Sequence, residues 1–350
     1  MLATRISPVT ASKPVTSPPD TNSAWKQIIS SAETFLQGVN RCLADQIQAF
    51  DPEIAVYARY ALTGQGKQLR PVLVALSAGA TGQINDSHTL AAVIVEMVHL
   101  ATLVHDDVMD EAEIRRGRPT LAANWGNEIS VLLGDCLFAQ ALKLAASFPT
   151  PEICRAVAAA TNTVCSGEIL QTQRKKNFEL SRAEYFKVLS MKTGELFALS
   201  CDLGAFLSGA HPGQRASLRQ YGLALGTAYQ VYDDCLDLFG SEETAGKSLG
   251  SDLAKGKMTL PMLWLLERAS VSERAKIQAL VRDWEPAFFP KMMGLLQAHE
   301  ALEESRRAVH QYLQAAGKAL RGLPESESCA SLFGLIDYLA QQADILRGST

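Results

Sequence analysis

The sequence of 350 residues lacks any pair of cysteines at metal-ligand spacing: its seven cysteines occur singly, and no CxxC motif is present. Most lie in apolar stretches that suit a helix, where a free thiol behaves as a small hydrophobic side chain. The six histidines show no metal-ligand spacing either. These absences argue against a disulfide framework and a zinc site, and they favour a reducing compartment such as the cytoplasm.

Long apolar runs and an excess of positive charge are also missing. No run reaches the roughly 18 uninterrupted apolar residues that a membrane span needs, and the longest candidate, residues 90–104, contains Glu96 and His99 and is predicted to be a buried helix. The 33 Lys and Arg residues are outnumbered by 37 Asp and Glu, which gives a net charge of −4. This balance argues against nucleic acid as the main partner, and no membrane anchor is expected.

Residues 1–24 lack apolar periodicity and are rich in Pro, Ser and Thr, so we expect a disordered tail without the apolar core of a signal peptide. Beyond residue 24, apolar residues recur at intervals of three and four, which is typical of amphipathic helices. Neither a β-hairpin nor an alternating β–α pattern is indicated. Residues 25–350 are predicted to form a single all-α domain, a bundle of long helices around a central cavity. The stretches long enough for extended helices are 90–110, 128–147, 152–174, 183–208 and 215–238.

An aspartate cluster occurs twice in this helical pattern: residues 106–110 read DDVMD, and residues 233–237 read DDCLD. In each cluster the first and last aspartates lie four residues apart and so share one face of a helix. Two such clusters facing one cleft need positive charge between them. All-oxygen carboxylate sites suit magnesium, which keeps several waters and is commonly completed by substrate phosphates. The pattern therefore predicts a magnesium–diphosphate site.

Basic residues are spaced along the chain at intervals that match the acidic clusters, which a solvated surface does not require. A single DDxxD is more often a solvated acidic helix face, so the combination carries the prediction. The basic segments are GKQLRP at 66–71, RRG at 115–117, KTG at 192–194 and the stretch 247–257.

From about residue 64 to 261, the chain resembles the trans-isoprenyl diphosphate synthases, the polyprenyl synthetase family, and most of all its long-chain members such as octaprenyl and solanesyl diphosphate synthases. Besides the segments above, the resemblance is carried by His105, Gly134-Asp135, Tyr229-Gln230 and Gly246-Lys247. It implies the isoprenoid synthase type I fold, usually as a homodimer. It also implies head-to-tail condensation of isopentenyl diphosphate with an allylic diphosphate.

The resemblance further implies roles for single residues. Two magnesium ions are expected on Asp106 and Asp110 and a third on Asp233, with Asp107, Asp234 and Asp237 farther from the metals or linked to them through water. The residues expected to grip the allylic diphosphate are Arg115, Lys192, Thr193, Gln230, Lys247 and Lys257. Those expected to hold isopentenyl diphosphate are Lys67, Arg70, His99 and Arg116. The catalytic set would be Asp106, Asp110, Asp233, Lys192 and Lys247.

The residue types suit this reaction. Breaking the carbon–oxygen bond of the allylic diphosphate places charge on the departing pyrophosphate, so metal ions and Lys or Arg aimed there lower the barrier. The allylic cation needs an apolar, water-poor cavity. No nucleophilic Ser or Cys is required, and the released pyrophosphate is expected to take the final proton.

Helix geometry also predicts a product length. One helical turn advances about 5.4 Å, close to one isoprene unit. If the helix ending at Asp106 lines the cavity, Thr102 and Ala101 form the first step of its wall, and Val98 and Met97 form the next. Small residues there leave the tunnel open, so we expect a product of about forty carbons and a shorter one in Ala101→Phe. The alternative is that these small residues serve helix packing.

Other functions are compatible with parts of the pattern. A short- or medium-chain synthase would make farnesyl, geranylgeranyl or geranylfarnesyl diphosphate. A terpene cyclase usually lacks the second DDxxD and the isopentenyl site, so residues 233–237 together with Lys67 and Arg70 argue against it. A non-catalytic subunit of a two-component synthase commonly loses the acidic or basic residues that this chain keeps. A plain helical binding protein would not explain the alternation of acidic and basic motifs.

Overall fold

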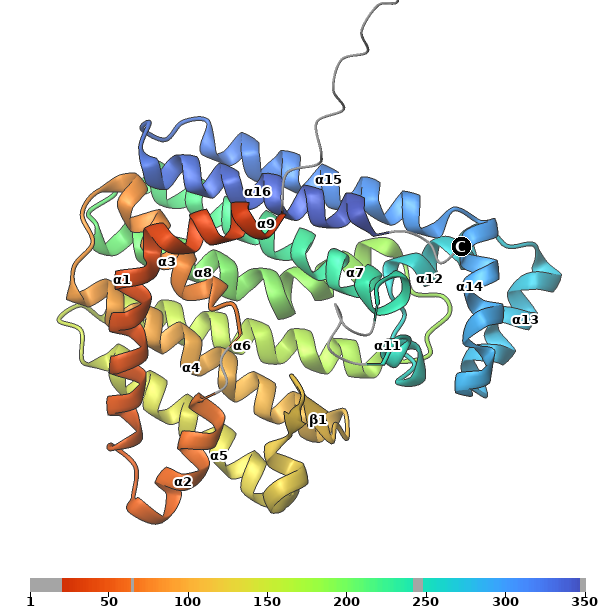
Figure 1. Ribbon diagram of the computed structural model, residues 1–350, viewed down its shortest axis with the longest axis horizontal. Helices are drawn as coiled ribbons and strands as arrows, with labels where there is room; N and C mark the ends of the chain where they lie inside the picture. The colour runs from red at the N-terminus through yellow and green to blue at the C-terminus, as the bar shows by residue number, and fades with distance from the viewer. Residues whose placement is uncertain (1–20, 64–65, 242–247, 347–350) are drawn as a thin grey trace, which may run out of the picture.

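The computed structural model describes residues 21–63, 66–241 and 248–346, and the predicted all-α class is confirmed (Figure 1). The elements before residue 180 are α1 (Thr21–Ile47), α2 (Pro52–Leu62), α3 (Leu69–Thr81), α4 (Asp86–Met109), β1 (Ile114–Arg115), β2 (Arg118–Pro119), α5 (Leu121–Ala146) and α6 (Pro151–Gln173). Those after it are α7 (Arg182–Leu189), η1 (Ser190–Gly194), α8 (Glu195–Leu207), α9 (Pro212–Phe239), α11 (Ser251–Ala254), α12 (Leu260–Arg268), α13 (Val271–Arg282), η2 (Pro286–Phe288), α14 (Phe289–Ala298), α15 (Ala301–Leu320) and α16 (Glu327–Ile345).

The long helices predicted from the sequence form, but several begin earlier because of their caps. The α4 helix begins at Asp86 because the side chains of Asn85 and His88 form a capping box there. The α5 helix follows Thr120, whose side chain accepts a hydrogen bond from the backbone of Ala123, and it continues across a kink at Gly126. The predicted helix 183–208 is α7 and α8, joined by the π-helical segment η1.

The start of α1 differs from the predicted domain boundary. This helix begins at Thr21, so residues 21–24, which the sequence pattern assigned to the tail, belong to a helix. The rest of the predicted tail, residues 1–20, lies outside the described residues.

A short β-ribbon follows α4, although the sequence pattern indicated no hairpin. Strands β1 and β2 pair antiparallel, and their turn is formed by Arg116 and Gly117, both with positive φ (52° and 74°). Such a turn matches the natural twist of two paired strands. The ribbon therefore directs Arg115 and Arg116 back toward the end of α4, which a continued helix would not do.

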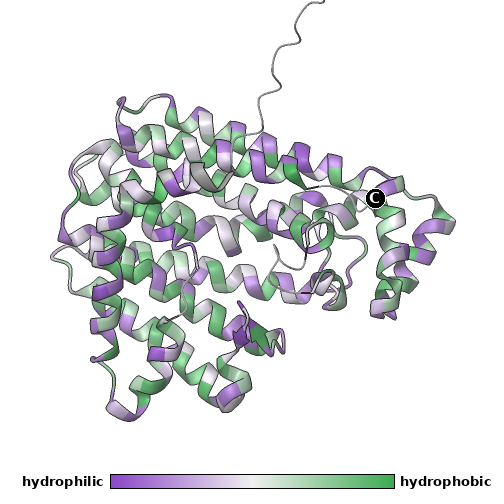
Figure 2. Ribbon diagram, in the orientation of Figure 1, coloured by the Kyte–Doolittle hydropathy of each residue, from purple (hydrophilic) through white to green (hydrophobic). Residues whose placement is uncertain are grey.

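Two hydrophobic cores hold the bundle together. One is built mainly by α3, α8, α9, α12, α15 and α16, and the other mainly by α1, α2, α4, α5 and α6. Figure 2 shows hydrophobic and hydrophilic residues along the same helices, as expected where one side of a helix packs inward and another meets water. The α4 and α9 helices carry the two aspartate clusters.

By length and composition, α4 and α5 could each cross a membrane, although neither has an uninterrupted apolar run. In α4, 67% of the apolar window is buried in the bundle, which confirms the predicted buried helix. In α5 only 33% of the window is buried, and Val131 and Leu132 are 41% and 60% exposed. The bundle therefore leaves an apolar face of α5 uncovered.

Candidate active site

Two cavities of about 590 and 530 Å³ share part of their lining. The larger extends along α4 toward apolar side chains of α5 and α6, and the smaller reaches the segment that contains α11. The residues that line both are Leu103, Asp106, Arg115, Arg116, Lys192, Thr193, Gln230 and Asp233. All of these except Leu103 were predicted from the sequence as site residues, so the structure brings the two halves of the predicted site together.

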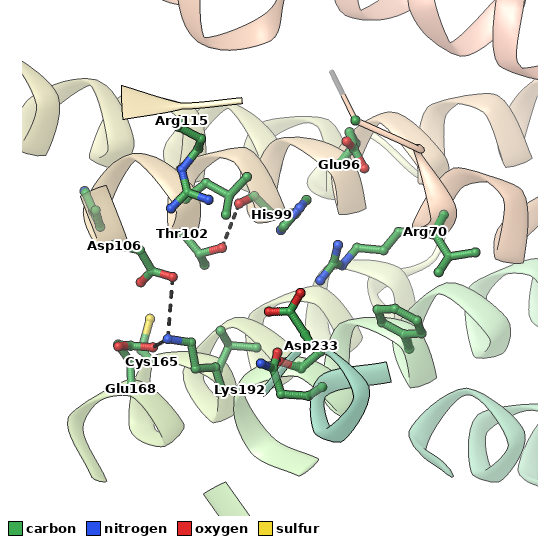
Figure 3. A pocket seen from close by; sticks show the side chains of 18 of the residues that line it. Arg70, Glu96, His99, Thr102, Asp106, Arg115, Cys165, Glu168, Lys192 and Asp233 are labelled. Atoms are coloured by element: carbon green, nitrogen blue, oxygen red, sulfur yellow. Dashed lines mark hydrogen bonds and ion pairs between the residues drawn. The ribbon is translucent and has the colours of Figure 1, made fainter. Parts of the chain in front are cut away.

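Lys192 connects α4 with α6. Its Nζ lies 3.6 Å from Oδ2 of Asp106, donates a hydrogen bond of 3.0 Å to Oε1 of Gln171 and forms an ion pair with Glu168. Figure 3 shows Asp106 on one side of the cavity facing Lys192 and Glu168 on the other. The lysine thus lies between two carboxylates and offsets their charge.

The local backbone explains how Lys192 reaches this position. It belongs to η1, a π-helical turn, and such turns are frequent at functional sites. On the facing helix α6, a Cβ added at Gly167 would lie 2.9 Å from the backbone nitrogen of Lys192. Only glycine lets α6 approach η1 this closely, and its neighbour Glu168 is thereby placed beside Lys192.

Asp110 is held by two lysines. The Nζ atoms of Lys257 and Lys255 lie 3.0 and 3.1 Å from its Oδ2. Burial alone would raise the pKa of Asp110, but Lys257 and Lys255 more than offset this and lower it to about 2. Lys257 also lies 3.5 Å from Asp252. Lys247, which the sequence places in the same group, lies outside the described residues.

The aspartates of the second cluster differ in the groups that surround them. Asp233 lines both cavities. Asp234 lines the smaller cavity and accepts hydrogen bonds from the hydroxyl of Tyr185 (2.6 Å) and from Nε2 of Gln230 (2.9 Å). Burial, followed by repulsion from Asp252, raises the pKa of Asp234 to about 7. Because Thr193 donates to Oε1 of the same glutamine (2.8 Å), a hydrogen-bonded chain fixes both predicted diphosphate contacts.

Two other aspartates predicted at a distance from the metals also support neighbouring groups. Asp237 accepts hydrogen bonds from Oγ of Ser251 and the backbone nitrogen of Asp252, at the start of α11. Asp107 accepts a hydrogen bond of 2.7 Å from Nε of Arg115. Their carboxylates thus hold the α11 segment and the β-ribbon against the site.

The residues predicted to hold isopentenyl diphosphate, Lys67, Arg70, His99 and Arg116, all line the larger cavity. The buried Nε of Arg70 has no hydrogen-bond partner among the described residues, and the guanidinium lies 5.0 Å from the ring centroid of Phe197. Burial and the charges of nearby arginines hold the pKa of His99 well below its usual value, so its ring is neutral. An anionic ligand would satisfy the donor of Arg70, since leaving a buried donor unpaired is costly.

Of the four residues predicted to form the chain-length wall, Thr102 lines the cavity. Ala101, Met97 and Val98 are at most 1% exposed, belong to the second core and are not among the cavity-lining residues. The cavity meets the face of α4 that carries His99, Thr102 and Asp106, and Ala101 lies off this face. The apolar side chains that complete the wall are Leu103, Val131, Phe138, Val164 and Ile169.

Sequence reasoning missed several charged residues of the site, including Glu96, Glu168 and Lys255. Glu96 lines the larger cavity and is 4% exposed; burial raises its pKa, and Arg70 and Arg116 partly offset the shift. A signal for both glutamates was present, because each is a lone charged residue in a long, mainly uncharged stretch of helix. Such residues are rarely buried without a partner. Lys255 lies within the basic stretch 247–257 but was not singled out there.

The donors available to a metal are carboxylate oxygens on opposing helices. Among the described residues, no three His, Cys, Asp or Glu side chains gather closely enough to hold a metal ion by themselves. Magnesium does not need three such side chains, because it usually binds one or two carboxylates and completes its coordination with waters and substrate phosphates. Asp106, Asp110 and Asp233 therefore suit magnesium bound together with a diphosphate.

Comparison with known proteins agrees with this geometry. Residues 51–287 match the family model of polyprenyl synthetase. The chain belongs to this family. The resemblance to this family that was predicted from the sequence is thereby confirmed. The class of enzyme is confirmed with it, since polyprenyl diphosphate synthases are prenyltransferases.

Individual members of the family are similar over most of the chain. An octaprenyl diphosphate synthase from Haemophilus influenzae is 34% identical over 88% of this chain and 94% of its own length. A heptaprenyl diphosphate synthase component 2 from Geobacillus stearothermophilus is 35% identical over 88% and 99%. The structure of a polyprenyl synthase from Caulobacter crescentus, complexed with calcium and isoprenyl diphosphate, superposes with a TM-score of 0.86 at 33% identity and covers 93% of this chain and 98% of that one.

Proposed function

We propose that this polyprenyl synthetase condenses isopentenyl diphosphate head-to-tail with an allylic diphosphate, depends on magnesium and makes an all-trans product of about forty carbons. One observation carries the proposal. Asp106 and Asp233 line the junction of two cavities, and Lys192 lies 3.6 Å from Asp106. One cavity leads toward Arg70 and an apolar wall, and the other toward Lys255 and Lys257.

The residues divide the reaction between them. In the smaller cavity, Lys192, Lys257 and Arg115 orient the allylic diphosphate and offset the charge that grows on the leaving pyrophosphate as its carbon–oxygen bond breaks. In the larger cavity, Arg70 and Arg116 hold isopentenyl diphosphate so that its double bond faces the allylic carbon and forms the new carbon–carbon bond. The proton lost from the condensed product passes to the departing pyrophosphate. The apolar wall excludes water, which would otherwise capture the allylic cation.

The proposed metal sites use Asp106 and Asp110 for two magnesium ions and Asp233 for a third. When bound, these ions would add positive charge at the departing pyrophosphate. The calcium in the Caulobacter structure supports a divalent metal in a protein of the same family.

The proposed length of about forty carbons is supported by the relatives, one of which is named for an octaprenyl product and another for a heptaprenyl product. It is also supported by the small side chain of Thr102 on the cavity wall. Shorter products of fifteen to twenty-five carbons are the alternative that product analysis distinguishes.

We further propose that the enzyme is a homodimer in the cytoplasm. The exposed apolar face of α5 offers a surface for a second copy. All seven cysteines are free in the structure, which suits a reducing compartment.

The decisive experiment is product analysis of the purified protein with labelled isopentenyl diphosphate, magnesium and allylic primers of ten, fifteen and twenty carbons. A ladder of products that ends near forty carbons is the expected result. A ladder that stops at fifteen to twenty-five carbons would contradict the proposed length and leave the reaction in place. Absence of elongation with every primer would contradict the proposal and favour the non-catalytic subunit.

The metal roles are tested with Asp106→Ala and Asp233→Ala. Each is expected to lower kcat by about a thousandfold, since each removes a group that holds charge at the developing pyrophosphate. Circular dichroism and thermal unfolding should remain close to wild type. Asp337→Ala, at an exposed position on α16, is the control and should retain full turnover. Normal turnover in either cluster variant would refute the assigned metal role.

A further inference from the structure

Lys67 makes a set of contacts at the edge of the site that the proposed reaction does not explain. Its Nζ lies 5.5 Å from the ring centroid of Trp25 and 5.5 Å from that of Tyr338. It also donates a hydrogen bond of 3.1 Å to the hydroxyl of Tyr338. The two rings are 5.3 Å apart, centroid to centroid. The ammonium is therefore held by two aromatic rings and one hydroxyl, which we call the Lys67 cradle.

The cradle joins parts of the chain that are far apart in sequence. Trp25 belongs to α1, Tyr338 belongs to α16, and Lys67 lies in the segment just before α3. These helices pack against one another in space, with α1 beside α16 and both beside α3 (Figure 1). A small cavity of about 20 Å³ touches both rings, and Lys67, Leu69 and Tyr229 line it as well as the larger cavity. The cradle is thus continuous with the cavity proposed for isopentenyl diphosphate.

The chemistry of the cradle differs from that of the other lysines in the site. Lys192 and Lys257 are paired with carboxylates, whereas among the described residues the cradle offers Lys67 the ring of Trp25 and the ring and hydroxyl of Tyr338. Aromatic rings and a neutral hydroxyl attract a cation without neutralising it. A lysine on a short connecting segment loses much rotamer freedom when it binds a ligand, and a partner that holds it beforehand reduces that loss. The cradle therefore orders the ammonium and leaves its full charge for an anion.

We propose that Trp25 and Tyr338 are positioning residues that hold Lys67 ready for the diphosphate of isopentenyl diphosphate. The proposal rests on the proposed function, in which Lys67 contacts that substrate. According to this proposal, α1 and α16 influence the affinity for isopentenyl diphosphate through these two side chains. The opposite role, in which the rings withhold Lys67 from the substrate, predicts a change of KM in the other direction.

The test is steady-state kinetics of Trp25→Leu, Tyr338→Leu and Tyr338→Phe, with isopentenyl diphosphate varied at saturating allylic diphosphate. Each leucine variant is expected to raise the KM for isopentenyl diphosphate about three- to tenfold, as loss of a cation–π contact implies. Tyr338→Phe keeps the ring and the packing of α16, so its rise should be about twofold. The KM for the allylic substrate and kcat should change little. Phe333→Leu, on the same helix and 39% exposed, is the control and should match wild type.

A double-mutant cycle distinguishes positioning from a general loss of structure. In a Lys67→Gln background, Tyr338→Leu is expected to cause no further rise in the KM for isopentenyl diphosphate, because the group that the ring positions is already gone. A full additional rise there, an unchanged or lower KM in the single leucine variants, or equal rises for both substrates would overturn the cradle. If wild-type protein elongates no primer, the proposed function fails, and the cradle fails with it. If wild-type protein elongates a primer and the variants keep its KM for isopentenyl diphosphate, the positioning role of the cradle is refuted and the proposed function stands.

Discussion

At the scale of single residues, the site is organised by pairs of opposite charge that hold each other in place. Lys192 lies between Asp106 and Glu168, and Lys257 and Lys255 both contact Asp110. These pairs are largely shielded from water, where charges interact more strongly than at a surface. Without a ligand, each lysine offsets a carboxylate. With a diphosphate bound, the same lysines can turn part of their charge toward phosphate oxygens.

Glu168→Gln tests whether this pairing positions Lys192. The amide keeps the shape of the side chain and removes its charge, so the ammonium is no longer drawn toward α6. We expect kcat/KM for the allylic diphosphate to fall about ten- to a hundredfold, equivalent to roughly 1.4–2.7 kcal/mol. The KM for isopentenyl diphosphate should stay near wild type, because neither Glu168 nor Lys192 is among the proposed contacts of that substrate. Steady-state kinetics with each substrate varied in turn measures both effects.

The control for this change is Glu152→Gln, which alters an exposed glutamate in the first turn of the same helix. It should leave all constants unchanged. If Glu168→Gln also leaves the allylic kcat/KM unchanged, Lys192 is held by η1 and Gln171 without help from Glu168.

The difference between predictable and unpredictable site residues is physical. Asp106, Asp233 and Lys192 lie in short motifs whose residue types indicate metal and phosphate binding from the sequence alone. Glu168 serves that chemistry only through Lys192, its partner from another segment, so the pairing depends on how α6 packs on η1. Ala101 shows the converse case: its distance from Asp106 in the sequence fits a wall position, whereas in the structure it lies in the second core and off the face of α4 that meets the cavity.

At the scale of elements, capping and local twist decide where side chains point. The pattern of apolar residues predicted the long helices, but the caps at Asn85 and Thr120 and the π-helical turn η1 set their ends and breaks. These features depend on a few polar side chains and on tertiary contacts, which a periodicity of three and four does not express. The β-ribbon was missed for the same reason, since its turn uses the positive φ of Arg116 as well as that of Gly117.

His88 makes the cap of α4 sensitive to pH. Its Nδ1 accepts a hydrogen bond from the backbone of Asn85 (3.0 Å), and its Nε2 donates to the carbonyl of Gly204 (3.2 Å). Burial lowers the pKa of His88 below its ordinary value of 6.5, so the folded protein binds a proton there less readily than the unfolded chain, which does so below about pH 6.5. The stability that this ring contributes is complete above that pH and declines as the pH falls, with a slope of at most about 1.4 kcal/mol per pH unit.

Urea unfolding at pH 7.5 and pH 5.5 measures this effect. Wild-type protein is expected to lose more free energy of unfolding between the two values than His88→Gln, whose side chain does not titrate. His310→Gln, which replaces an exposed histidine on α15 that contacts the exposed side chain of Asp344, controls for the loss of a histidine. An exposed pair of this kind contributes little to stability, so this variant should behave like wild type. Equal pH dependence in wild type and His88→Gln would refute the assignment.

The face that α4 presents to the cavity leads to a prediction about product length. Thr102 lines the cavity, so Thr102→Phe is expected to block elongation and shift the product toward fifteen or twenty carbons. Ala101 is fully buried in the second core, so Ala101→Phe is expected to cost about 1–3 kcal/mol of stability through overpacking. Product analysis and thermal unfolding of both variants test the two expectations. If Ala101→Phe makes a shorter product and Thr102→Phe does not, then Ala101, and not Thr102, limits the length of the product.

At the scale of the whole molecule, the two cores and the cavities between their helices leave one apolar surface, on α5, exposed. The sequence predicted the bundle and the buried role of α4, because both follow from apolar periodicity. It could not show which apolar residues of α5 stay exposed, since that depends on what the other helices of the same chain cover. Val131 and Ile169 are 41% and 59% exposed and also line the larger cavity. Its apolar wall is therefore open to water in a single chain.

A second copy packed against α5 would close this wall, and Leu132→Glu tests that arrangement. Leu132 is 60% exposed, so glutamate there should leave the monomer fold intact while placing a charge in an apolar interface, where an unpaired charge is costly. We expect light scattering after gel filtration to show a dimer for wild type and a monomer for Leu132→Glu. Val271→Glu, at a 90% exposed position on α13, should remain a dimer. Because water can then enter the apolar wall, the monomer should make less long-chain product and release more allylic alcohol. A dimer that persists in Leu132→Glu would place the interface elsewhere.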